Sequence, residues 1–414
     1  MASIRVRLTN PKVQQAFEEV PGSGQNSNLP YLMRALTDCG NAERLIDQHG
    51  ECLRFCAAKR QWLFWNGVRW VAGRGSAVQL TKKMVRAMRH ERSQLLSQSE
   101  DEHGDWEVAR RQVDALTRWA HRSEGAAQIS SALRMAESDP RVSVTLEELD
   151  RDPWVLNLPN GSMDLRSAIF REHRPEELIT KVAGAEYKAN ARCPRWKKFL
   201  GEVFAPHLDI IPYLQRAVGY ALTGQTREEC IVVLVGSGRN GKSTLITLLH
   251  HLFGEYGGVA EMDTFLTSGA NKLREDIADM RGRRFISAQE PFINSTFAEA
   301  TIKWVSGGDK LRARRLYEHA QEFQPTHKLW LAMNRLPALR SNDHAAWSRL
   351  RIIPFDVSFT DTCNQELKHE LRSELSGILG WALQGCTAWQ RKGLGSAKSI
   401  EEAKQLWRRL GKKS

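Results

Sequence analysis

The 414-residue sequence has no apolar run near the ~18 residues that a membrane-spanning helix needs. Its first residues, Met1 to Arg7, also lack the apolar core of a secretory signal peptide. We therefore expect no membrane partner and a protein that stays in the cytoplasm where it is made.

Paired cysteine motifs are also missing. The seven cysteines are scattered and odd in number, and no C-x-x-C occurs, which argues against a disulfide framework. Cys39, His49, Cys52 and Cys56 lie close enough in sequence to suggest a zinc site as an alternative. We favour buried thiols on one helix face, because Cys52 and Cys56 are one helical turn apart.

Acidic residues are fewer than basic ones, 48 against 60, which gives a net charge of +12. Half of this excess lies in residues 310–351, where nine Lys and Arg face three acids. Although a basic balance can serve solubility alone, a local basic patch favours a nucleic-acid partner.

A complete phosphate-loop pattern, G-x-x-x-x-G-K-[ST], occupies residues 236–244. It reads Gly236, Ser237, Gly238, Arg239, Asn240, Gly241, Lys242, Ser243 and Thr244. The apolar, β-branched run 231–235 before it predicts a buried strand, and leucines at helical spacing after it predict a helix that ends near Gly254. This order sets a helix N-terminus against a phosphate. We expect ATP with Mg²⁺, where Lys242 reaches the β- and γ-phosphates and the Ser243 hydroxyl binds the metal.

Two further predicted strands end in polar side chains suited to phosphate chemistry. The strand 284–289 leads to Glu290, a carboxylate that can hold magnesium or orient water. The strand 329–333 leads to Asn334, whose amide can contact the γ-phosphate or the attacking water. Alternatively, Glu290 is an ordinary acid at a strand end and Asn334 only forms a turn.

Two arginines, Arg349 and Arg351, precede the apolar residues 352–355. An arginine donated by a neighbouring subunit stabilises charge on a transferring phosphoryl group. Ion pairing on the surface is the alternative, and the residues alone leave both open.

The chain divides by composition into four segments. Residues 1–30 form a polar, flexible lead-in, and residues 31–190 form a mixed α+β module with Asn66-Gly67 and Asn160-Gly161 turns and helices within 77–137. We assign its tryptophans to core packing rather than to base stacking. Residues 191–356 form the ATPase domain and 357–414 a helical segment.

From residue 37 to about residue 394, the chain resembles the helicase half of phage and plasmid primase–helicases, akin to the poxvirus type, which are superfamily-3 helicases of the AAA+ class. The matching stretches are residues 236–244, 274–284 with Glu290, 306–317, 323–337 and 346–350. The resemblance implies an α/β fold: an AAA+ P-loop NTPase core on a parallel sheet, a mixed α+β N-terminal module before it and a short helical tail after it.

The resemblance also implies roles for residues. Lys242 and Ser243 belong to its first motif, Glu290 to the second and Asn334 to the sensor motif, while Arg349 matches the family's arginine better than Arg351. A pore hairpin is implied at 316–320, with His319 near its tip. The DNA-contacting residues are then Lys310, Arg312, Arg314, His319 and Lys328.

Together these features predict an ATP-dependent DNA helicase for a phage, plasmid or integrated mobile element, acting in the host cytoplasm. Its expected partners are single-stranded and forked DNA, other copies of itself in a ring of six by the family's implication, and a separate primase or origin-binding protein. The alternatives are a DNA-stimulated ATPase that remodels or loads replication proteins, a small-molecule kinase, and a DNA-binding factor with an inactive ATP site.

Overall fold

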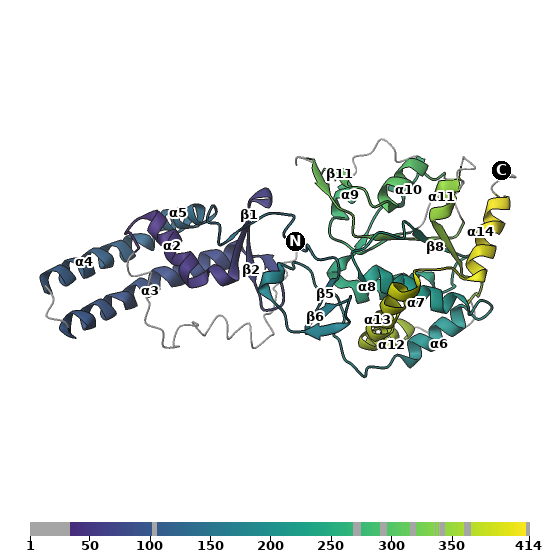
Figure 1. The fold of residues 1–414 in the computed structure, drawn as a ribbon, viewed down its shortest axis with the longest axis horizontal. Helices are drawn as coiled ribbons and strands as arrows, with labels where there is room; N and C mark the ends of the chain where they lie inside the picture. Colours follow the sequence, from purple (N-terminus) through teal and green to yellow (C-terminus); the bar gives the residue numbers. More distant parts are fainter. Residues whose placement is uncertain are drawn as a thin grey trace. The chain divides into compact units, whose positions relative to one another are not determined.

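The computed structural model describes residues 34–101, 106–267, 275–289, 296–314, 320–335, 337, 339, 344–359 and 366–410 (Figure 1). These residues divide into two compact units. One comprises the chain up to Arg151 together with Arg174–Thr180, and the other comprises Asp152–His173 and the chain from Lys181 onward. In the described part, no helix is both long and apolar enough to cross a membrane.

The first unit combines four helices with a four-stranded sheet. Its elements are α2 (Asp38–His49), α3 (Arg74–Asp101), α4 (Trp106–Ser123), α5 (Ala126–Ala136), β1 (Leu53–Cys56), β2 (Gln61–Trp65), β3 (Trp70–Ala72) and β4 (Ser143–Val144). The sheet order is β3-β2-β1-β4. The expected hairpin is present, since Trp65 pairs with Trp70 across a turn in which the Asn66 side chain accepts two backbone N–H groups. The helices predicted within 77–137 are also confirmed.

The aromatic residues of this hairpin pack inward, as predicted. Trp62 and Trp70 are buried, and Trp62 packs with residues of α2 and α3. The prediction that Cys52 and Cys56 share a helix face is wrong. Cys56 lies in strand β1 and Cys52 in the short 3₁₀ helix Gly50–Cys52, because the apolar run that follows pairs with β2. Among the described residues, no cluster of His, Cys, Asp or Glu is suited to a metal ion.

The second unit is built on a five-stranded, all-parallel sheet, as the sequence predicted. Its strands are β8 (Ile231–Val235), β9 (Gly257–Val259), β10 (Phe285–Gln289), β13 (Lys328–Met333) and β14 (Leu350–Pro354). The strand order is β14-β8-β13-β10-β9, so β8 lies inside the sheet. The carboxyl ends of these strands share one edge, where open parallel sheets bind ligands.

Strand β8 is apolar throughout because both of its faces are covered. Ile231, Val233 and Val235 contribute to one hydrophobic cluster, while Val232 and Leu234 contribute to another on the opposite face. This arrangement is the reason that no polar alternation appears in its sequence.

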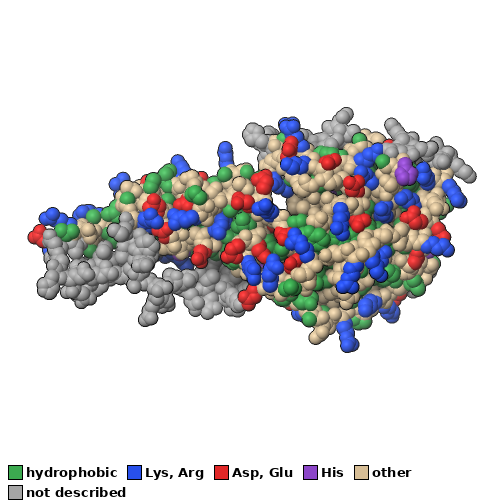
Figure 2. Space-filling view, in the orientation of Figure 1, with side chains coloured by type: hydrophobic (Ala, Val, Ile, Leu, Met, Phe, Trp, Pro, Cys, Tyr) green, Lys and Arg blue, Asp and Glu red, His purple; other side chains and the backbone are tan. Residues whose placement is uncertain are grey.

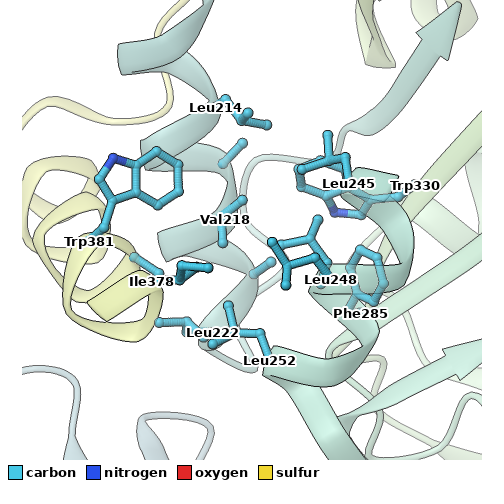
Figure 3. Packing of buried hydrophobic residues seen from close by; sticks show 14 of the residues in the cluster. Leu214, Val218, Leu222, Leu245, Leu248, Leu252, Phe285, Trp330, Ile378 and Trp381 are labelled. Atoms are coloured by element: carbon cyan, nitrogen blue, oxygen red, sulfur yellow. The ribbon is translucent and has the colours of Figure 1, made fainter. Parts of the chain in front are cut away.

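Helices on both faces complete the second unit. They are α6 (Pro194–Val203), α7 (Ile210–Leu222), α8 (Lys242–Phe253), α9 (Glu275–Asp279), α10 (Glu299–Ser306), α11 (His344–Arg349), α12 (Leu367–Ser373), α13 (Leu375–Lys392) and α14 (Lys398–Leu410). On one face, leucines of α7 and α8 pack with Trp381 of α13 and with Phe285 and Trp330 of the sheet (Figure 3). The helical C-terminal segment therefore shares the core of the sheet.

Two smaller sheets belong to the same unit. Strands β5 (Val155–Leu158), β6 (Gly161–Asp164) and β7 (Ile169–Arg171) form an antiparallel meander, and β11 (Leu311–Ala313) pairs with β12 (Gln321–Phe323) as a hairpin. The meander contains the predicted Asn160-Gly161 turn, with Leu158 paired to Gly161. Residues 152–173 belong to this unit and residues 174–180 to the first, so the chain passes between the two units at residues 151, 173 and 180 rather than once at 190.

Candidate nucleotide-binding site

The loop between β8 and α8 carries the phosphate-loop pattern in a strained backbone conformation that requires glycine. Gly241, which precedes α8, has φ +91°, and a Cβ there would lie 2.9 Å from Val203 Cγ2. At Gly236, a Cβ would lie 2.3 Å from the carbonyl oxygen of Phe355. Two of the loop's glycines are therefore needed for the loop to close against its neighbours, and α8 then begins directly behind it.

Lys242, the first residue of α8, folds back over this loop. Its Nζ donates to the Gly236 carbonyl at 2.6 Å and to Asn240 Oδ1 at 3.0 Å, and it lies 3.5 Å from Asn334 Oδ1. The residue is buried, and this burial lowers the pKa of its ammonium. A phosphate placed here would favour the charged form, because an opposite charge opposes the desolvation effect.

Asn334 therefore meets Lys242, as the sequence predicted. Met333, the last residue of β13, pairs with Val235 of β8, so that Asn334 follows its strand at the same level as Gly236. Its side chain is exposed at the edge of the sheet. Glu290 follows Gln289, the last residue of β10, but Glu290 lies outside the described residues.

Asn240 has a second role that sequence reasoning missed. Its Nδ2 donates to the Phe355 carbonyl at 3.0 Å, and its Oδ1 accepts from Lys242. The side chain is buried and ties the loop to the segment after β14, and the Phe359 N–H donates to the Arg239 carbonyl nearby. An asparagine within the variable positions of the pattern gives no indication of this contact.

The hydroxyl of Ser243 is the candidate metal ligand in the described part of the loop. Ser243 is exposed in the first turn of α8, next to the buried Lys242. Mg²⁺ usually binds through one or two protein oxygens together with substrate phosphates and water, so a dense carboxylate cluster is not needed. An exposed hydroxyl beside the loop fits this kind of site.

Arg349 lies near the amino-terminal ends of the strands, whereas the phosphate loop lies at their carboxyl ends. Leu350 pairs with Ile231, the first residue of β8, so Arg349 is level with Cys230, six residues before Gly236 and about 20 Å from it at ~3.3 Å per residue. Its Nη1 donates to Glu229 Oε2 at 2.6 Å. Arg351 is half-buried and donates to the carbonyls of Ser348 and Leu350. Neither arginine is placed to reach the loop of its own chain.

The predicted DNA contacts divide into two groups. Lys310, Arg312 and Arg314 are exposed on or beside β11, with Arg312 paired opposite Glu322 of β12. His319 lies outside the described residues. Lys and Arg are interspersed with acids over the face drawn in Figure 2, so that view shows no single-sign field.

Lys328 does not fit its predicted role. It is 5% exposed, and its Nζ donates to the carbonyls of Thr223, Gln225 and Thr326 while lying 4.9 Å from the centre of the Tyr220 ring. Burial lowers its pKa well below the ordinary value. With its donors used inside the core, this ammonium is not available to a DNA phosphate, and we leave it out of the DNA surface.

Two family models match the sequence. One is described as D5 N terminal like and matches residues 42–205, and the other is described as a family of unknown function and matches residues 234–349. The second match covers the phosphate loop, the basic hairpin and Arg349.

Viral proteins are among the relatives. A protein of Acanthamoeba polyphaga mimivirus named "Putative helicase" is 31% identical over 221 residues, which is 52% of this chain and 23% of that protein. A Frog virus 3 protein with the same kind of name is 28% identical, over 51% of this chain and 29% of its own. A "Putative primase" of African swine fever virus is 23% identical, over 58% of this chain and 26% of its own.

Parts of this chain are therefore similar to the D5 N terminal like family and to viral proteins named as putative helicases or primases. The chain spans about a quarter of the length of the viral relatives that it matches. Among solved structures, the apo C-terminal region of NrS-1 superposes with a TM-score of 0.50 at 12% identity, covering 87% of this chain and 71% of that one. This last likeness concerns the fold alone.

Proposed function

We propose that this D5-like chain is an ATP-dependent DNA helicase of superfamily 3, within the AAA+ class, which serves the replication of a phage, plasmid or integrated mobile element. The observation that carries the proposal is the meeting of Lys242 and Asn334 at the carboxyl ends of adjacent parallel strands. A lysine and a neutral amide beside a helix N-terminus form a site for the terminal phosphates of ATP.

Each residue then has a distinct task. Lys242 exchanges its loop contacts for the β- and γ-phosphates, and Asn334 orients the attacking water through its two-sided amide. Ser243 and Glu290 would hold Mg²⁺, and the ion would supply positive charge against the phosphates. Glu290 also accepts the proton of the water as it attacks.

The nucleotide site is shared between subunits. Arg349 lies at the amino-terminal ends of the strands, away from the phosphate loop of its own chain. Its guanidinium therefore serves the phosphate loop of a neighbouring copy. Contacts of this head-to-tail kind close into a ring when the rotation between subunits permits. Six subunits is the number that the resemblance implies.

The exposed cations of the β11–β12 hairpin grip DNA inside the ring. Lys310, Arg312 and Arg314, with His319 after them, contact phosphates of one strand without reading its sequence. Hydrolysis around the ring moves these hairpins along single-stranded DNA and separates a forked duplex. A separate primase or origin-binding protein is the expected replication partner.

Strand displacement on a forked duplex tests this proposal. We expect ATP-dependent unwinding by the full chain and none by Lys242→Ala. Lys198→Ala, which removes an exposed lysine, is the matched control and should behave as wild type. ATPase activity that rises with single-stranded DNA but never separates strands would instead indicate a remodelling or loading ATPase. Phosphoryl transfer to a small acceptor would indicate a kinase.

A further inference from the structure

The five residues before β8, Thr226–Cys230, hold one carboxylate in a conformation that glutamate rarely adopts. Glu229 has φ +42°, in the left-handed region that favours glycine, and its N–H donates to the Thr226 carbonyl at 3.1 Å. Non-glycine residues keep such a conformation only where surrounding contacts impose it, and these positions concentrate at functional sites.

The residues next to Glu229 supply those contacts. Glu228 Oε1 accepts from Trp389 Nε1 at 2.7 Å and from the Leu394 N–H at 3.3 Å, and the Arg227 guanidinium lies 4.2 Å from the centre of the Trp389 ring. The two residues before Glu229 thus attach the loop to Trp389 of α13 and to the segment that follows this helix. Next to these contacts, the Glu229 side chain meets Arg349, the last residue of α11.

Glu229 contacts Arg349, and it holds this arginine through one nitrogen of the guanidinium. Nη1 donates to Glu229 Oε2 at 2.6 Å and to the Glu229 carbonyl at 3.4 Å. The buried Nε has no partner among the described residues, and no described residue accepts from Nη2. One edge of the guanidinium is therefore fixed, and the edge with Nη2 is left for another acceptor.

We propose that Glu229 is the positioning residue for Arg349, holding Nη1 so that Nη2 faces the triphosphate bound by the neighbouring subunit. This inference rests on the proposed function, in which Arg349 acts between subunits. A long, flexible side chain that is ordered before the reaction loses less freedom at the transition state, so the carboxylate raises turnover without touching ATP.

A structural role and a positioning role for Glu229 predict different results. The Glu229 side chain is 52% exposed, and exposed ion pairs contribute little to stability. Glu229→Gln should therefore keep the wild-type melting temperature. Glu229→Gly should also relieve the left-handed backbone, so its melting temperature should equal or exceed that of wild type.

The decisive measurement is steady-state ATPase activity of the full chain with single-stranded DNA. We expect both Glu229 variants to lower kcat about tenfold or more with an unchanged KM for ATP, as is usual when a positioning contact is lost. Adding Glu229→Gln to Arg349→Ala should lower kcat no further. Glu402→Gln, which removes an exposed ion pair with Lys398, is the matched control and should keep wild-type turnover.

Mixed subunits locate the effect. Glu229→Gln has an intact phosphate loop, and Lys242→Ala supplies an intact Arg349 with its Glu229, so a mixture should regain turnover relative to either variant alone. If Arg349→Ala is inactive but Glu229→Gln turns over normally, the positioning role is wrong while the shared site stands. The same holds if the double variant loses more kcat than Arg349→Ala alone. If Arg349→Ala turns over normally, both the shared site and the role of Glu229 are refuted.

Discussion

The contact between Lys242 and Asn334 leads to a prediction with opposite signs for ligand binding and stability. Asn334→Asp places a carboxylate about where Oδ1 now lies, 3.5 Å from Lys242 Nζ. At that distance the attraction is about 5 kcal/mol at an effective dielectric constant of about 20 and about 1 kcal/mol in bulk water. Since Lys242 is buried and Asn334 is exposed, we take an intermediate value of about 2 kcal/mol.

The new carboxylate competes with the phosphates for Lys242 and also repels them. An energy of about 2 kcal/mol corresponds to about a thirty-fold weaker affinity for nucleotide. Without nucleotide, the same carboxylate compensates the buried ammonium, so the free energy of unfolding should stay the same or rise by about 1 kcal/mol. Asn334→Ala should slow hydrolysis without this gain in stability.

Two assays on the same protein test the reasoning. Titration calorimetry with a non-hydrolysable ATP analogue and Mg²⁺ gives the affinity, and urea unfolding without nucleotide gives the stability. Asn190→Asp, at an exposed position of the same unit, makes the same change of charge and should alter neither. If Asn334→Asp binds the analogue as tightly as wild type, Asn334 and Lys242 do not serve one phosphate site.

Three other predictions concern charge and pH. Replacing Lys310, Arg312 and Arg314 together by alanine should weaken binding to single-stranded DNA and reduce the slope of log affinity against log salt by about 2, measured by fluorescence anisotropy. Lys328→Ala should leave that slope unchanged. It should lower the free energy of unfolding by about 3 kcal/mol, because it leaves a cavity in the core beside carbonyls that have lost their donor. A changed slope would mean that Lys328 does contact DNA. Burial lowers the pKa of His327 to about 4. As pH falls, this histidine therefore becomes protonated in the unfolded chain before it does in the folded one. The free energy of unfolding should accordingly fall between about pH 6.5 and pH 4. From pH 7 to pH 5, wild type should lose about 2 kcal/mol more than His327→Gln in urea unfolding, and equal losses would contradict a buried neutral imidazole.

Features that depend on neighbouring residues were predictable from the amino-acid sequence. The apolar run 231–235, the glycines after it and the leucines of α8 each act over a few residues, so strand, loop and helix were predictable in order. The Asn66-Gly67 turn was predictable for the same reason, because turn chemistry is local. The contact between Asn334 and Lys242 was also predictable, because Asn334 follows a predicted strand and the carboxyl ends of parallel strands lie at the same side of a sheet.

Which charged side chains remain accessible depends on packing between segments that are far apart in the chain. Lys328 is bonded to a carbonyl 105 residues earlier in the chain, and Arg349 is paired with Glu229, 120 residues away. The number of charges in residues 310–351 does not distinguish Lys328 from its exposed neighbours. Its position at the start of the apolar strand β13 was the one local indication that it is buried. A residue's own chemistry states what it can bind, but which partner removes it from solvent depends on packing between distant segments, and no short stretch of sequence contains that information.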